Sequence, residues 1–101
     1  MQIEITTDRN PEGWGSECDE VIAQRAAERL AEMLADEAQR EWPDAEVQFG
    51  TIYVTSGYSH QIARVSADSV AEQMATQEVA AQIAAWSEEL WEAALAVAIR
   101  T

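Results

Sequence analysis

The sequence predicts an α+β fold in the order β-α-β-β-α, with a small three-stranded sheet and two long helices packed on one of its faces. Two segments, 17–41 and the stretch from residue 66 onward, carry apolar residues at the 3.6-residue spacing of helices. Stretches rich in β-branched and aromatic residues lie before and between them, as expected of strands. No linker or internal repeat divides the chain, so we expect one domain, residues 1–101.

The N-terminal stretch from residue 2 to residue 7 alternates between polar and apolar side chains. Ile3 and Ile5 fall on one face, which is the pattern of a half-buried strand. Residues 8–15, DRNPEGWG, are dense in turn-forming residues and predict a loop.

The first helix is expected over residues 17–41. Ser16 and Asp19 form an S-x-x-D capping signature, in which Ser16 is the N-cap. Pro43 ends the helix, because the residue before a proline is pushed out of the α region. One apolar stripe runs along it: Cys18, Ile22, Ala26, Leu30, Met33, Leu34, Ala38 and Trp42.

Two further strands are expected, over residues 46–55 and 60–65, joined by a hairpin turn at 56–59. The apolar pattern of the first of them changes phase at Gly50, which predicts a β-bulge there. The N-terminal strand would lie beside one of these two strands. An alternative is that Ser59 already begins a helix that continues into the next segment.

The C-terminal helical segment is apolar on two sides. Val70 and Met74 come first, and Thr76 either caps a new helix or lies within a continuous one. The main stripe is Val79, Ile83, Trp86, Leu90, Ala94 and Val97. A second row, Trp91, Leu95 and Ile99, is displaced from it by roughly 120°. The first helix could cover this second row, a second copy of the chain could form a dimer through it, or a different protein could dock on Trp91.

The charge of the chain limits its partners. It carries 19 acidic residues and six Arg, for a net charge of −13, and residues 1–50 alone hold 13 acids against four Arg. Direct binding to nucleic acid needs a basic footprint and is therefore not expected, whereas a basic protein surface is a natural partner. Acidity that serves only solubility or salt tolerance is the alternative. No apolar stretch of about 20 residues and no signal sequence are seen, which favours a cytoplasmic protein without membrane association.

Few residues offer chemistry. Cys18 and His60 are the only cysteine and the only histidine, and no catalytic signature flanks either one. Cys18 also belongs to the apolar stripe of the first helix, which favours a structural role for it. No metal-binding or cofactor-binding motif occurs, so we expect a protein without cofactors that is not an enzyme.

The leading hypothesis is an acidic protein-binding module. On the first helix Glu28, Glu32 and Asp36 stand four residues apart on one face, where their carboxylates could take the place of nucleic-acid phosphates. Small phage-encoded inhibitors, including anti-CRISPR and anti-restriction proteins, share this profile of size and charge. The expected partner-binding residues are Glu28, Glu32, Asp36, Trp14, Glu17 and Glu20. Trp14 either folds back on the core or is an exposed anchor. The alternative function is a homodimeric assembly protein that associates through Trp91, Leu95 and Ile99.

Overall fold

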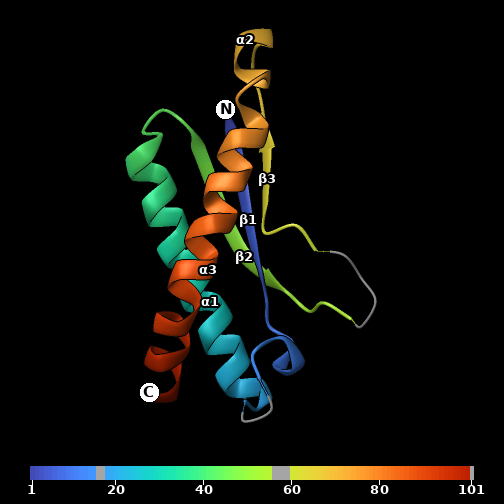
Figure 1. The fold of residues 1–101 in the computed structure, drawn as a ribbon, viewed down its shortest axis with the longest axis vertical. Helices are drawn as coiled ribbons and strands as arrows, with labels where there is room; N and C mark the ends of the chain where they lie inside the picture. The colour runs from blue at the N-terminus through green and yellow to red at the C-terminus, as the bar shows by residue number, and fades with distance from the viewer. Residues whose placement is uncertain (16–17, 56–59, 101) are drawn as a thin grey trace.

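The computed structural model of the chain describes residues 1–15, 18–55 and 60–100. It confirms the predicted α+β class, a three-stranded mixed sheet with two long helices packed on it (Figure 1). The elements are β1 (Gln2–Asp8), the short 3₁₀ helix η1 (Pro11–Gly13), α1 (Glu20–Glu41), β2 (Glu46–Ile52), β3 (Ala63–Ser66), α2 (Val70–Gln73) and α3 (Thr76–Arg100).

The N-terminal strand occupies the centre of the sheet, whose strand order is β2-β1-β3. β2 pairs with β1 in parallel, and β3 pairs with β1 in antiparallel orientation. A parallel pair needs a long crossover, which α1 provides. The expected hairpin is therefore wrong in its pairing, because β2 and β3 lie on opposite sides of β1. Its turn, residues 56–59, lies outside the described residues.

The bulge expected at Gly50 is also wrong. The register between β1 and β2 runs without interruption from Gln2↔Glu46 to Asp8↔Ile52, and Gly50 is the ordinary partner of Thr6. The change of phase falls at the end of the strand, because Ile52 is the last residue of β2 and Val54 lies beyond it. Phe49 shares the face of Ile5 but is 54% exposed, so the apolar residues of β2 do not all face one core.

The core lies between the sheet and the two helices. Ile3 and Ile5 of β1 are fully buried together with Leu34 of α1 and Ile83 of α3. α1 packs on β1 and β2 and also along α3, so it lies in the middle of the molecule. Thr7 ties the helix to the sheet, because its hydroxyl donates a hydrogen bond of 2.6 Å to the backbone carbonyl of Ala27.

The first long helix begins later than its capping signature predicts. Asp19, and not Ser16, is the N-cap, and its carboxylate accepts a hydrogen bond from the backbone N–H of Ile22 at 2.8 Å. Cys18 therefore precedes the helix. Ser16 and Glu17 lie outside the described residues.

The region from residue 63 to residue 76 contains both a strand and a break between two helices. β3 is followed by the single turn α2, which Ser69 caps, and α3 starts separately at Thr76. Val70 and Met74, the apolar residues expected to face a core here, are more than four-fifths exposed. α2 projects beyond the end of the sheet, so these side chains have little of the molecule to pack against (Figure 1).

Candidate partner-binding site

The carboxylate row of α1 faces solvent along its whole length. Glu28, Glu32 and Asp36 are all exposed, while the other sides of the helix are buried against the sheet and α3. Four residues of helix rise about 6 Å, which sets the spacing between successive carboxylates. Because eight residues of α1 are buried, the backbone that carries this row is fixed by packing on two sides.

Each member of the row has a different local environment. Glu28 accepts a hydrogen bond from the side-chain amide of Gln24 at 3.1 Å. Glu32 makes an ion pair with Arg29 at 3.6 Å, and both side chains are about half exposed. Arg40 follows Asp36 by four residues, but its guanidinium binds Glu37 at 2.7 Å and not the carboxylate of Asp36. Within the described part of the chain, the carboxylate of Asp36 makes no hydrogen bond or ion pair.

A shallow hollow connects the row to the other long helix. It has a volume of about 290 Å³ and is lined by Arg25, Glu28, Arg29 and Glu32 of α1, and by Val97 and Ala98 of α3. Two cations and two carboxylates border this hollow, so the charges of Glu28 and Glu32 are partly balanced there. The sequence did not indicate that the end of α3 would lie beside the row.

Trp14 is folded back on the core and is not an exposed anchor. Its side chain is only 8% exposed, and its indole N–H donates a hydrogen bond of 2.5 Å to the backbone carbonyl of Asp8. The ring also packs edge-on against Trp91, with 6.3 Å between the ring centroids. Glu20 is exposed at the start of α1, and Glu17 lies outside the described residues.

The second apolar row of α3 is covered in part by this chain. Leu95 packs against the core, and Trp91 is 38% exposed beside Trp14. Ile99 is 62% exposed. Packing within the chain therefore accounts for Leu95 and most of Trp91, and it leaves Ile99 exposed.

The two chemically reactive side chains have separate partners. The thiol of Cys18 lies 3.6 Å from the backbone carbonyl of Trp14. The Nε2 atom of His60 lies 3.1 Å from the hydroxyl of Thr6. Among the described residues, no group of three His, Cys, Asp or Glu side chains is arranged to hold a metal ion.

Comparison with models of known protein families, with curated proteins and with solved structures finds no match. In the described part of the chain, no helix has the length and apolar character needed to cross a membrane.

Proposed function

We propose that this protein is a non-enzymatic module that binds a basic surface of a partner protein through the exposed carboxylates of α1. The observation that carries the proposal is the row Glu28, Glu32 and Asp36, all exposed on a helix whose remaining sides are packed. A row held on a rigid helix loses little conformational freedom when it meets a partner. The net charge of −13 would also speed the approach of a basic surface.

The intramolecular contacts of the row are weak enough to be exchanged. An exposed ion pair such as that between Arg29 and Glu32 contributes about 0–1 kcal/mol. A partner arginine that binds the carboxylate with two hydrogen bonds can therefore displace Arg29 at little cost. Asp36 offers a carboxylate that needs no such exchange, so we expect it to be the strongest single contact.

The particular activity that we propose is that of a phage-type inhibitor, similar to anti-CRISPR or anti-restriction proteins that act as nucleic-acid mimics. A line of carboxylates can occupy a basic groove that otherwise binds phosphates. Small size, strong acidity and a regular row of exposed carboxylates support this proposal. Binding of this kind should weaken with salt, and DNA should compete with it.

The test compares two charge-reversed variants of equal net charge. In the first, Glu28, Glu32 and Asp36 are each changed to Arg. In the control, the exposed acids of α3, Glu88, Glu89 and Glu92, are changed in the same way. The wild-type protein and both variants are immobilised separately on beads and incubated with cell extract. The proteins retained on the beads are identified by mass spectrometry. Each retained protein is then purified, and its affinity for the wild type and for both variants is measured.

We expect the wild type and the α3 control to retain the same partner, and the α1 variant to lose it. Affinity should fall steeply as salt is raised, and added duplex DNA should displace the partner. Equal retention by both variants, or an affinity that stays flat across the salt range, contradicts the proposal. Circular dichroism of all three proteins confirms that the fold is kept.

A second candidate function, homodimerisation through α3, is favoured by the exposure of Ile99. Light scattering of the wild type and of Ile99→Glu distinguishes the two. A dimer that becomes a folded monomer in the variant supports this candidate, and a wild-type monomer at high concentration excludes it. The two functions are compatible, because a dimer would carry two carboxylate rows.

A further inference from the structure

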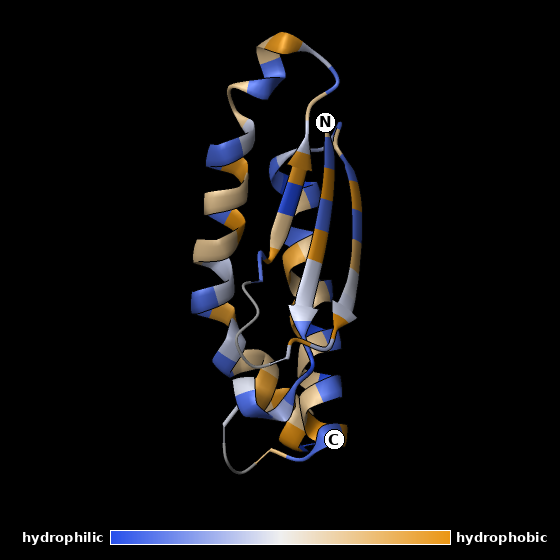
Figure 2. Ribbon diagram, turned by 90° about the vertical axis from the view of Figure 1, so that its right-hand side faces the viewer, coloured by the Kyte–Doolittle hydropathy of each residue, from blue (hydrophilic) through white to orange (hydrophobic). Residues whose placement is uncertain are grey.

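The helix layer of the molecule is wider than its sheet. α1 packs on two strands, β1 and β2, whereas α3 packs mainly on β3. Figure 2 shows α3 standing beyond β3, on the side of the sheet away from β2. Neighbouring strands lie about 4.8 Å apart, and packed helices lie about 8–10 Å apart, so two helices side by side span roughly the width of four strands. The outer flank of α3 therefore has no strand beneath it.

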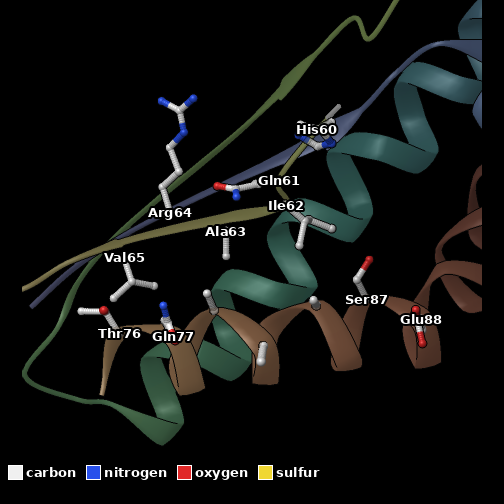
Figure 3. Close-up of a pocket in the computed structure, with 13 residues that line it drawn as sticks. His60, Gln61, Ile62, Ala63, Arg64, Val65, Thr76, Gln77, Ser87 and Glu88 are labelled. Carbon is white, nitrogen blue, oxygen red and sulfur yellow. The ribbon is translucent and has the colours of Figure 1, made fainter. Parts of the chain in front are cut away.

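A groove of about 740 Å³ occupies the place of this missing strand. Its walls are residues 60–65, which include most of β3, and the outer flank of α3. Three alanines of α3 line it, Ala80, Ala81 and Ala84, and their small side chains leave the space open. Figure 3 shows Ala63 and Val65 of β3 directed towards α3, and Arg64 directed away from it.

The free edge of β3 presents backbone groups to this groove. The backbone N–H of Thr6 donates to the carbonyl of Ile62 at 2.9 Å, next to the register pairs Ile5↔Ala63 and Glu4↔Arg64. In an antiparallel pair, residues alternate between those that bond to the neighbouring strand and those that point outward. Ile62 and Arg64 therefore bond towards β1, and the N–H and C=O groups of Ala63 and Val65 point away from it. Ala63 is only 6% exposed and Val65 is half-buried, so Val65 is the more accessible of the two.

We propose that this edge accepts an extended segment of a partner protein as a fourth strand. The strand would bond to the backbone of Ala63 and Val65, and every second side chain would rest against the alanines of α3. Small or β-branched apolar side chains suit this position, because Ala80, Ala81 and Ala84 form the side of the groove that α3 contributes. A segment of four or five residues spans about 13–16 Å, which matches the length of β3.

The charges at the groove specify a basic segment. Figure 3 shows Thr76 and Gln77 at one end of the groove and Ser87 and Glu88 at the other. Glu88 is the one acid among the residues that line the groove, and the side chain of Arg64, the cation among them, points away from α3. The best occupant has an apolar centre and a cation at the end that meets Glu88, and the net charge of −13 favours a basic segment as a whole. A second copy is a poorer occupant, because each copy carries a net charge of −13.

The probe is a capped heptapeptide, Arg-Thr-Val-Thr-Val-Thr-Arg, whose binding to ¹⁵N-labelled protein is measured by NMR titration. We expect shifts at the amides of residues 63–66 and slower hydrogen exchange at Ala63 and Val65. Replacing both arginines of the peptide by glutamate should abolish binding. N-methylation of the peptide amides that face β3 should also abolish it, since ladder hydrogen bonds are then lost.

Two neighbouring alanines of α3 give a matched pair of protein variants. Ala84 lines the groove and Ala85 does not, and both are exposed, so either should accept a larger side chain without loss of the fold. Ala84→Trp should weaken peptide binding by about tenfold or more, while Ala85→Trp should leave it nearly unchanged. The Arg variants of Glu28, Glu32 and Asp36 should also keep this binding, which separates this site from the carboxylate row.

Three results would overturn the inference. The first is equal affinity of the Ala84→Trp and Ala85→Trp proteins for the peptide. The second is binding that survives N-methylation or charge reversal of the peptide. The third is a wild-type dimer that Ala84→Trp converts to a monomer, because a second copy would then occupy the groove.

Discussion

The two long helices differ in a way that their compositions do not suggest. α3 is the more apolar of the two, yet it buries only Val79, Ile83, Ala94 and Ala98. α1 is the more polar, yet it buries eight residues, six of them alanines. α1 packs on β1 and β2 and along α3, whereas α3 packs mainly on β3 among the strands and lies at the margin of the helix layer. Position in the fold, and not hydrophobicity alone, therefore decides how much of a helix is buried.

The largest effect is expected when a leucine is replaced by alanine on each helix in turn. Leu34→Ala on α1 removes a fully buried side chain and should lower the free energy of unfolding by about 2–5 kcal/mol. Leu95→Ala on α3 removes a partly exposed side chain and should cost clearly less. Urea denaturation of both variants gives the two values. Equal losses would mean that the helices are equally important to the core.

A smaller effect is expected when side chains are enlarged. Ala31 of α1 is fully buried, and Ala31→Leu should destabilise the protein by about 1–3 kcal/mol through overpacking. Ala93 of α3 is exposed, so Ala93→Leu should change stability by no more than about 0.5 kcal/mol. Thermal unfolding compares the two variants. A tolerated leucine at position 31 would show that α1 is packed more loosely than its burial indicates.

The start of α1 allows a test of its cap. Asp19→Ala removes the acceptor for the backbone N–H of Ile22 and should cost about 1 kcal/mol. Asp19→Asn keeps an acceptor and should restore most of this loss, which distinguishes capping from charge. Denaturant unfolding provides the measurement. If the asparagine variant is as unstable as the alanine variant, the carboxylate acts through its charge.

The smallest expected effect on stability concerns the ion pairs that join the N-terminal amino group to the residues around α2. The amino group of Met1 lies 2.6 Å from Asp68 and 3.3 Å from Glu72. The hydrogen bond to Asp68 is the main cause that raises the pKa of this amine, Glu72 adds to it, and desolvation opposes it. The raised pKa means that the folded state holds the proton more tightly than the unfolded chain does.

The contribution of this amine is therefore complete below about pH 8, the ordinary pKa of an α-amine, and is lost as pH rises through the raised value. The midpoint of urea unfolding should fall slightly over that range in the wild type. Asp68→Asn should reduce the fall. A midpoint that drops by the same amount in both proteins would assign the change to other groups.

Sequence reasoning located most of the elements because they depend on local periodicity. The stripe on α1 and the alternation of Ile3 and Ile5 appear as helix and strand in the structure. The errors fall where a long-range contact decides the outcome. The phase change at Gly50 predicted a bulge, but β2 pairs with β1 in unbroken register and ends at Ile52, before Val54. The exposed carboxylate row of Glu28, Glu32 and Asp36 could be predicted from its spacing. The position of Val97 and Ala98 beside this row could not, because it depends on how α3 packs on α1.

The sequence by itself determined which segments are helical or extended, which side of α1 carries carboxylates, and how acidic the chain is. These properties follow from the order of neighbouring residues and the fixed geometry of helix and strand. Only the tertiary structure decided that β1 is central, that Trp14 is buried, and that β3 leaves an open edge beside α3. Those features depend on contacts between residues far apart in the chain, and local periodicity is the same whichever strand becomes the neighbour.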